Sequence, residues 1–156
     1  MSKSVRRVER AAAELGLDIH VRRMGESTRT AEDAARACGC DVAQIVKSLI
    51  FKGGDSGDLI LLLVSGANQV VMDAASHATG EPLVRADAAE VRTRTGFAIG
   101  GVSPIGHLEA PLIWMDETLL DYSTVWAASG APDAVFEIAP DTLRTATGAI
   151  PASLSA

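Results

Sequence analysis

Two stretches decide the fold of this chain: residues 45–52, Ile-Val-Lys-Ser-Leu-Ile-Phe-Lys, and residues 59–64, Leu-Ile-Leu-Leu-Leu-Val. Both are rich in the branched and aromatic residues that suit a pleated strand. Between them, residues 53–58 read Gly-Gly-Asp-Ser-Gly-Asp, a composition typical of a tight connection, so we predict a hairpin. The second stretch is apolar at every position, which predicts a central strand covered on both faces.

Helices and shorter strands are expected on both sides of this hairpin. Apolar spacing and capping residues predict helices over 4–15, over 31–38 after Thr30 as N-cap, over 73–79, from Asp87 to Gly96, and from Pro140 to Gly148. Further strands are expected at 20–24, 83–85, 112–115, 124–128 and 134–138. This interleaving predicts an α/β or α+β fold with a mixed sheet, and a single domain over residues 1–156.

The composition excludes several classes of protein. With 47% hydrophobic and 22% charged residues, the chain is not expected to be disordered. No apolar run is long enough to cross a bilayer and the basic N-terminus lacks the apolar core of a signal peptide, so we expect a cytoplasmic protein without a membrane partner. A net charge of −6 argues against coating nucleic acid, and DNA is not an expected partner. A local basic pocket for one RNA end stays open.

Lys47 is the most unusual residue of the first strand. Strand alternation places it on the same face as Leu49 and Phe51. An ammonium group among apolar side chains must reach water or find a partner. Two interpretations stay open: an ordinary strand lysine whose stem packs while its head is hydrated, or a cation at the floor of a cleft that faces a phosphate or a carbonyl.

A glycine-rich stretch at residues 95–107, Thr-Gly-Phe-Ala-Ile-Gly-Gly-Val-Ser-Pro-Ile-Gly-His, is the second candidate. The adjacent Gly100 and Gly101 allow a backbone to approach a ligand and expose its N–H groups, and Pro104 stiffens the far end. No Gly-Lys-Ser/Thr follows, so this is not a Walker loop. Ser103 lacks the glycine of a nucleophile elbow two residues later, so we do not assign it as a nucleophile. A plain connecting loop remains the alternative.

The histidines and cysteines carry weaker signals. His20, His77 and His107 lack metal-ligand spacing, so neither a metal nor a cofactor is expected. His107 follows the glycine-rich stretch and is placed to line the same cleft, although an ordinary loop or core histidine is an equally good interpretation. Cys38 and Cys40 are expected to be half-buried thiols in a reducing compartment.

Acidic and aromatic residues near the C-terminal strands are expected to be structural. The cluster of Asp116, Glu117 and Asp121 is typical of a solvated turn rather than an acid–base pair. Trp114 and Trp126 fall in predicted strands and are expected in the core rather than as platforms for nucleic-acid bases.

Four motifs in series resemble the YbaK/prolyl-tRNA-synthetase-associated domain family. In order they are Thr30-Ala31-x-x-Ala34-Ala35; Ile45-Val46-Lys47-Ser48-Leu49; Thr95-Gly96 with Gly100-Gly101-Val102-Ser103-Pro104-Ile105-Gly106-His107; and Trp126-Ala127-Ala128-Ser129-Gly130. Their order and spacing fit from about residue 4 to residue 148. The resemblance implies a curved, barrel-like mixed sheet flanked by helices. It also implies an enzyme, an aminoacyl-tRNA deacylase that hydrolyses wrongly charged tRNA in trans for translation fidelity.

The resemblance also implies the site. Lys47 is expected to be the catalytic residue that helps to hold the charged 3′ end and pairs with a phosphate or polarises the carbonyl. The expected substrate-binding residues are Thr30, Ser48, Gly100, Gly101, Val102, Ser103, Pro104 and His107. An aminoacyl ester is already activated, so positioning and modest polarisation suffice. We expect the N–H groups of Gly101 and Val102 to steady the ester oxygens while water attacks.

Substrate choice and partners follow from the same resemblance. The family includes deacylases for alanine, cysteine, serine and threonine on tRNA, so a small pocket that excludes larger side chains is expected. The expected partner is the 3′ end of aminoacyl-tRNA, and the acidic surface also suggests a synthetase or the elongation machinery. Two alternatives stay open: a non-catalytic module that binds charged tRNA or a synthetase, and a regulator that binds a nucleotide or an amino acid.

Overall fold

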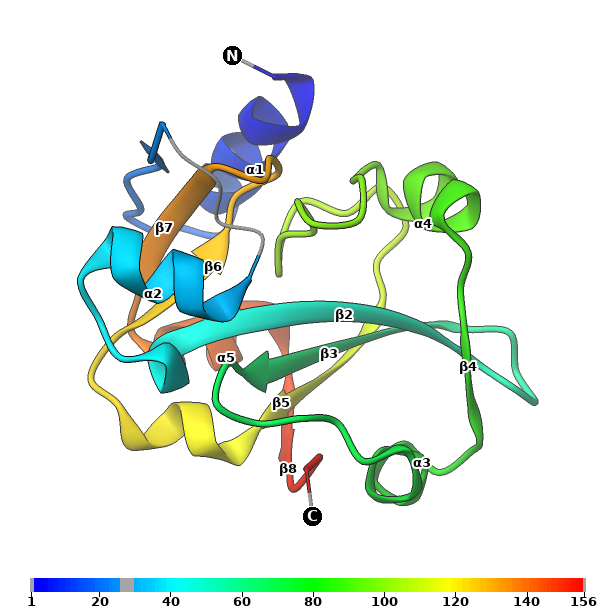
Figure 1. Ribbon diagram of the computed structural model, residues 1–156. Helices are drawn as coiled ribbons and strands as arrows, with labels where there is room; N and C mark the ends of the chain where they lie inside the picture. Colours follow the sequence, from blue (N-terminus) through cyan, green and yellow to red (C-terminus); the bar gives the residue numbers. More distant parts are fainter. Residues whose placement is uncertain (1, 26–29, 156) are drawn as a thin grey trace.

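The computed structural model describes residues 2–25 and 30–155, and Figure 1 shows how they are arranged. In this part of the chain, eight strands form one mixed sheet in the order β1-β7-β6-β2-β3-β5-β8, and β4 pairs with β2 beside that path. The sheet is not closed, since β1 and β8 stand at its two ends. The expected mixed α/β fold is confirmed, as an open sheet rather than a closed barrel.

Five helices pack on this sheet within the described residues. The strands are β1 (Arg22–Arg23), β2 (Ile45–Gly53), β3 (Leu59–Ser65), β4 (Leu83–Arg85), β5 (Leu112–Asp116), β6 (Val125–Ala128), β7 (Ala134–Ile138) and β8 (Ile150–Ala152). The helices are α1 (Lys3–Glu14), α2 (Ala31–Cys38), α3 (Met72–Thr79), α4 (Ala88–Thr95) and α5 (Pro140–Thr147), with 3-10 turns η1 (Val42–Gln44) and η2 (Glu117–Asp121). None of these helices is long and apolar enough to span a membrane.

The predicted hairpin is the centre of the sheet. β2 and β3 pair in antiparallel register, with Leu49 opposite Leu62. Every residue of β3 is buried, because both of its faces are covered. Leu61 and Leu63 point into the main core, whereas Ile60, Leu62 and Val64 point into a second cluster on the other face. The prediction of a central, doubly covered strand is confirmed.

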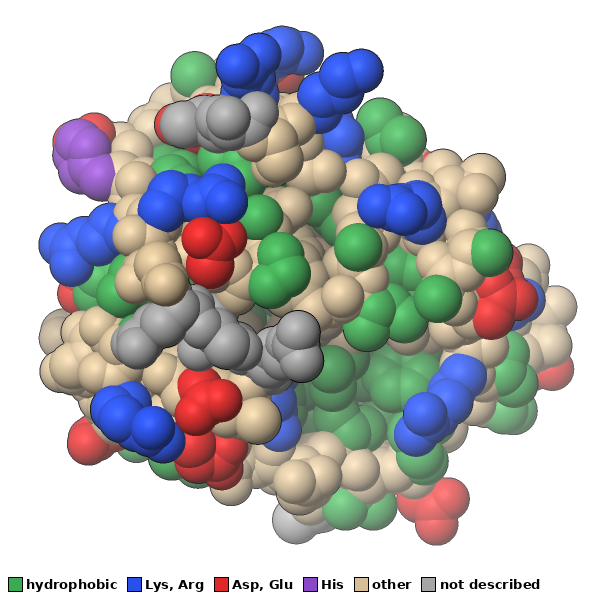
Figure 2. Space-filling model, turned by 45° about the horizontal axis from the view of Figure 1, so that its top comes forward, with side chains coloured by type: hydrophobic (Ala, Val, Ile, Leu, Met, Phe, Trp, Pro, Cys, Tyr) green, Lys and Arg blue, Asp and Glu red, His purple; other side chains and the backbone are tan. Residues whose placement is uncertain are grey.

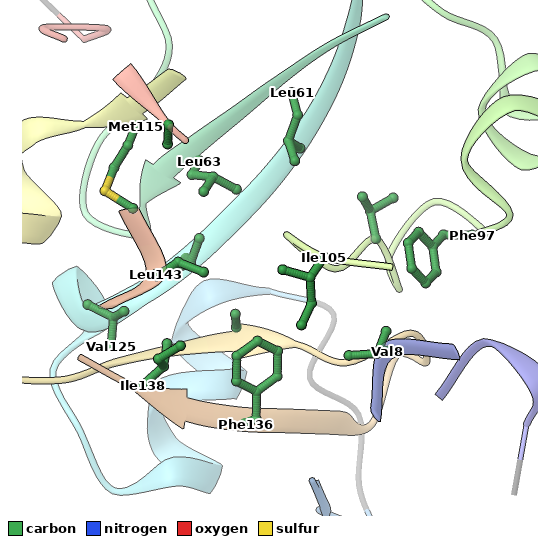
Figure 3. Close-up of a cluster of buried hydrophobic side chains, with 14 of the residues drawn as sticks. Val8, Leu61, Leu63, Phe97, Ile105, Met115, Val125, Phe136, Ile138 and Leu143 are labelled. Atoms are coloured by element: carbon green, nitrogen blue, oxygen red, sulfur yellow. The ribbon is translucent and has the colours of Figure 1, made fainter. Parts of the chain in front are cut away.

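The core consists of a main cluster and two smaller ones. Figure 3 shows the main cluster, in which Phe97 and Phe136 meet Val8 of α1 and Ile105 of the glycine-rich loop. The second cluster lies between the sheet and α3, and the third between the sheet and α2. Trp126 is buried in the third cluster and Trp114 packs on the second, so both tryptophans are core residues as predicted.

The helices begin and end where their capping residues predict. The Thr30 hydroxyl accepts a hydrogen bond from Asp33 N at 3.0 Å, and the Asp87 carboxylate accepts one from Glu90 N at 2.8 Å. Each of these side chains satisfies an amide that the first helical turn leaves unpaired. At the end of α2, Cys38 and Cys40 are free, half-buried thiols, and burial raises the pKa of Cys38 to about 11.

Two predictions for the strands need correction. The first short strand is only Arg22–Arg23, shorter than the expected 20–24. The chain also forms β8 after the last helix, where no strand was predicted, because Ile150 finds a parallel partner in Trp114 of β5. A three-residue strand that contains a proline has almost no local signal and depends on its neighbour for pairing.

Candidate functional site

The site begins at a gap in the sheet beside β2. On one edge, β2 is paired with β3 from Val46 to Lys52. On the other edge, β6 pairs only with Ile45 and Val46, and β4 only with residues 51–53. Residues 47–50 therefore have no strand partner on that edge. We call this gap the β2 opening.

Ser48 presents its peptide groups to the β2 opening. Ile45 O accepts a bond from Gly66 N, and Gly53 N donates to Asp58 O, so the peptide groups of odd-numbered residues point toward β3. Peptide groups alternate along a strand, so those of Val46, Ser48, Ile50 and Lys52 point to the opposite edge. The peptide groups of Val46 pair with β6 and those of Lys52 pair with β4, but the peptide groups of Ser48 have no strand partner.

The Lys47 side chain lies on the face of β2 that carries Leu49 and Phe51, as predicted, which we call the outer face. Its ammonium group donates to the main-chain oxygen of Asn68, in the segment after β3. That segment passes close to the start of α2, since a Cβ at Gly66 would come within 2.9 Å of the Ala31 side chain. Lys47 is therefore held against the segment after β3, and its ammonium group has two further N–H donors to offer.

A buried carboxylate fixes the acceptor of Lys47. Asp116 is 1% exposed, and its carboxylate accepts from Ser65 N at 3.1 Å, from Asn68 Nδ2 at 2.9 Å and from Thr118 N at 3.0 Å. The prediction of a solvated turn is wrong for Asp116. Sequence analysis missed Asp116 and Asn68 because they lie 48 residues apart, and no local spacing connects them.

Two serine hydroxyls near the β2 opening are buried without a partner among the described residues. Ser48 Oγ and Ser129 Oγ each lack a hydrogen bond. Both serines lie two residues beyond Val46 and Ala127, which are opposite each other in the β2–β6 pair. Val46 and Ala127 face the main core, so alternation places both hydroxyls on this inner face, opposite to Lys47.

The glycine-rich loop packs on the same inner face. Val102 and Ile105 join Val46 in the main core, and Gly101 packs on the turn after β6, since a Cβ there would meet Ala131 at 3.2 Å. Gly100 is exposed, whereas residues 101–105 are buried. Figure 1 shows this loop above β2.

The loop offers fewer amides than the sequence suggested. Gly101 N donates to Ala98 O at 3.0 Å, so this amide is engaged within the loop, and its role in steadying the ester stays a prediction. The Val102 amide has no such bond within the described residues, and it stays a candidate donor. Ser103 is 0% exposed, and its hydroxyl accepts from Ile105 N, which agrees with the prediction that it is not a nucleophile.

Helix α1 holds both ends of the loop. Arg7 Nε donates to Gly106 O at 2.6 Å and Arg7 Nη2 to Thr95 O at 3.5 Å, while the Ser4 hydroxyl donates to Gly96 O at 3.2 Å. The Arg7 guanidinium also lies 4.6 Å from the centre of the Phe97 ring. Because these contacts close on the two ends of one loop, α1 sets the position of the loop over β2.

His107 braces the loop from within. Its Nε2 lies 2.6 Å from Ser103 O, so this nitrogen carries the proton, and its ring packs edge-on against Phe97. Burial is the main cause that lowers the pKa of His107 to about 4; the hydrogen bond to Ser103 O opposes this shift and the nearby Arg7 charge adds to it. His107 is therefore neutral at pH 7, and its buried Nδ1 has no partner among the described residues. A substrate contact through His107 stays a prediction.

Thr30 is exposed at the first turn of α2, and its hydroxyl is used as the helix cap. Its role in substrate binding stays a prediction, like those of Ser48, Gly100 and Pro104. Figure 2 shows hydrophobic side chains at the centre of this face of the molecule, with basic and acidic side chains around them. Lys47 and the β2 opening together offer a cation and free hydrogen-bonding groups, which suit binding and polarisation of an ester or a phosphate.

Comparison with known proteins decides the family. Residues 25–146 match the family described as the aminoacyl-tRNA editing domain. This chain belongs to that family. The match covers all four motifs that carried the resemblance in sequence, so the resemblance is confirmed. The editing domain is thus an aminoacyl-tRNA deacylase that acts in translation fidelity.

Individual relatives agree with this assignment. One crystal structure, of "a putative trans-editing enzyme for prolyl tRNA synthetase", matches with a TM-score of 0.94 at 46% identity, over 100% of this chain and 99% of that one. The "Putative Cys-tRNA(Pro)/Cys-tRNA(Cys) deacylase EbsC" of Enterococcus faecalis is 24% identical over 123 residues, 78% of this chain and 74% of that protein. The proline–tRNA ligase of Lactobacillus helveticus is 31% identical over 109 residues, which are 69% of this chain but 19% of the ligase.

Proposed function

We propose that this editing domain hydrolyses, in trans, the ester bond of tRNA wrongly charged with a small amino acid of the alanine, cysteine, serine or threonine class. The observation that carries the proposal is the β2 opening with Lys47 at its edge. It offers an ammonium group and unpaired peptide groups within a few residues of each other. These groups suit the 3′ end of a charged tRNA, which carries a phosphate, an ester carbonyl and a free amino group.

The chemistry needs positioning more than a strong nucleophile. Water attacks the carbonyl carbon of the ester, the bond to the ribose oxygen breaks, and that oxygen takes up a proton. Asn68 O uses one N–H of Lys47, so the others can bind the terminal phosphate or polarise the carbonyl. We infer that the neighbouring ribose hydroxyl of the substrate relays the proton, and a substrate that ends in 2′-deoxyadenosine tests this step, because hydrolysis at the normal rate would exclude it.

We propose that selectivity for small side chains arises at the inner face of the opening. The opening spans residues 47–50 between two paired segments, and the main core closes it from within. One methylene changes binding by only about 1–3 kcal/mol, so a synthetase cannot reject a slightly smaller amino acid by binding alone, and a second site that excludes the larger one is needed.

The partner of this site is the 3′ end of aminoacyl-tRNA, and its place of action is the cytoplasm, where translation occurs. Two of the comparisons support a link with prolyl-tRNA synthetase: the crystal structure of 46% identity and the matching segment of a proline–tRNA ligase. We infer that the tRNA for proline is the first substrate to examine. A complex with a synthetase or with the elongation machinery is a further possibility for a domain with a net charge of −6.

A deacylation panel tests the proposal. Purified protein is incubated with tRNA charged with alanine, cysteine, serine, threonine or proline, and loss of the ester is followed against buffer alone. The variant Lys47→Met is compared with Lys52→Met, because Lys52 lies on the same strand but pairs with Glu90 at 2.9 Å. We expect loss of one small amino acid with wild-type protein, a fall in kcat of about 10²–10³-fold for Lys47→Met, and little change for Lys52→Met.

Other results would redirect the assignment. Full activity of Lys47→Met would remove Lys47 from the site. Tight binding of charged tRNA without hydrolysis would favour the non-catalytic module.

A further inference from the structure

Ser48 is unusual because none of its polar groups has a partner within the described residues. Its amide and carbonyl face the β2 opening, and its hydroxyl is buried without a hydrogen bond. In folded proteins the large majority of buried side-chain polar atoms have a hydrogen-bond partner, so the buried Ser48 hydroxyl is an exception. Ser48 thus combines two main-chain groups that lack a strand partner with a buried, unpaired hydroxyl, and this combination points to a position that receives a ligand.

We propose that the aminoacyl group of the substrate docks in the β2 opening as a one-residue strand opposite Ser48. Its α-ammonium group donates to Ser48 O, and its ester carbonyl accepts from Ser48 N–H. The proposal rests on the proposed function, because it assumes that the ligand is an aminoacyl ester.

An amino-acid ester has the polar groups that this edge requires. It carries an N–H donor and a carbonyl acceptor on either side of one Cα, as a residue of a strand does. In an antiparallel sheet, two opposite residues of a hydrogen-bonded pair exchange both bonds. Peptides add to free sheet edges in this way, with main-chain bonds for affinity and pockets for selectivity. Because β6 and β4 close the opening at both ends, a single residue fits where a longer peptide would meet paired strands.

This docking assigns a donor to the reacting carbonyl. The Gly101 amide already donates to Ala98 O. The Ser48 amide is free, belongs to a strand of the central hairpin and is therefore held rigidly. As water adds, negative charge develops on the ester oxygen, and a fixed amide at that oxygen stabilises the transition state.

The same docking accounts for the size limit on the side chain. Opposite residues of an antiparallel pair direct their side chains to the same face. The substrate side chain therefore points with Ser48 Oγ to the inner face, toward Ser129 Oγ and the apolar Val46. That face holds the packed main core. The docking therefore predicts that a methyl, hydroxymethyl or mercaptomethyl group is accepted more readily than a longer chain.

Two measurements test the docking. The first compares Ser48→Pro, which lacks the amide N–H, with Ser48→Ala, which keeps it and loses only the hydroxyl. Proline is tolerated on a strand edge that has no partner, and circular dichroism and thermal melting check the fold. The second compares alanyl-tRNA with propionyl-tRNA, which lacks the amino group, each rate being divided by that of its uncatalysed hydrolysis.

We expect Ser48→Pro to lower kcat by about 10²–10³-fold relative to Ser48→Ala. Propionyl-tRNA should lose about 10- to 100-fold of the wild-type rate enhancement, since it lacks a charge-assisted hydrogen bond. A folded Ser48→Pro as active as Ser48→Ala, or an equal enhancement for both esters, would overturn the docking. If Ser48→Pro does not fold, the comparison of alanyl-tRNA with propionyl-tRNA still tests the docking. Failure of wild-type protein on every charged tRNA of the panel would instead overturn the proposed function.

Discussion

Replacing Arg7 by methionine is expected to release the glycine-rich loop while leaving the helix that carries it intact. Methionine keeps the apolar stem and loses the guanidinium that bonds Gly106 O at 2.6 Å and lies 4.6 Å from the Phe97 ring centre. Thr95 O keeps a second donor, Leu108 N at 3.0 Å, so Gly106 O is the group left unpaired. The perturbation therefore falls mainly on one end of the loop.

The magnitude follows from these two contacts. A hydrogen bond from a charged group contributes about 1.5–3 kcal/mol, and a partly exposed cation–π contact roughly 0.5–1 kcal/mol. We expect Arg7→Met to lower the free energy of unfolding by about 2–4 kcal/mol, which for a chain of this length corresponds to roughly 4–16 °C in Tm. Deacylation is expected to fall as well, because the loop closes the inner side of the β2 opening.

The assay is calorimetric melting and urea denaturation of Arg7→Met beside Arg6→Met. Arg6 is exposed on the same helix, so its replacement is expected to stay within about 0.5 kcal/mol of wild type. Arg7→Lys should be intermediate, since one ammonium group cannot reach both ends of the loop. Equal stability of Arg7→Met and Arg6→Met would refute the reasoning that α1 holds the loop through Arg7.

Three further predictions concern stability. The pKa of His107 is lowered to about 4 in the folded chain, so between about pH 6.5 and pH 4 the unfolded chain binds a proton that the folded chain does not. The free energy of unfolding should therefore fall by up to about 3 kcal/mol as the pH drops through this window. Urea titrations at pH 7 and pH 5 measure this, and the same slope in His107→Gln would contradict it. Asp116→Asn removes an acceptor from Asn68, so it should cost about 1–3 kcal/mol and slow deacylation, and an unchanged urea midpoint would argue against this role. Gly130→Ala would bring a Cβ within 2.8 Å of the Ser4 carbonyl, whereas the added Cβ of Gly57→Ala meets no atom within 4 Å. The Tm of Gly130→Ala should therefore fall further than that of Gly57→Ala. Equal shifts in Tm would show that α1 does not pack on Gly130.

Sequence alone predicted those features of the fold that depend on neighbours along the chain. Thr30 was identified as a helix cap because its hydroxyl bonds an amide only three residues away. The outward position of Lys47 followed from the period of two along a strand. The central place of β3 followed from an apolar residue at every position, since only a doubly covered strand buries both faces.

The rest depends on residues that only the fold brings together. Lys47 and its acceptor Asn68 are 21 residues apart, and Asp116, which binds the Asn68 side chain, lies another 48 residues along the chain. No local pattern therefore marks these three residues as one unit. The engagement of the Gly101 amide by Ala98 is a property of how the loop turns, which glycine content does not determine. The β2 opening is defined by where β6 and β4 stop pairing, and pairing lengths follow from the whole sheet.

The position of α1 has a consequence for where this domain begins and ends. The family match covers residues 25–146. Ser4 and Arg7, which hold the loop at Gly96 and Gly106, lie before that range, and β8 lies after it. A chain trimmed to the matched residues would keep Lys47 and the glycine-rich loop, but it would lose α1, the helix that holds this loop in place over β2. The matched residues 25–146 are thus shorter than the unit that must be made, moved or fused as a whole.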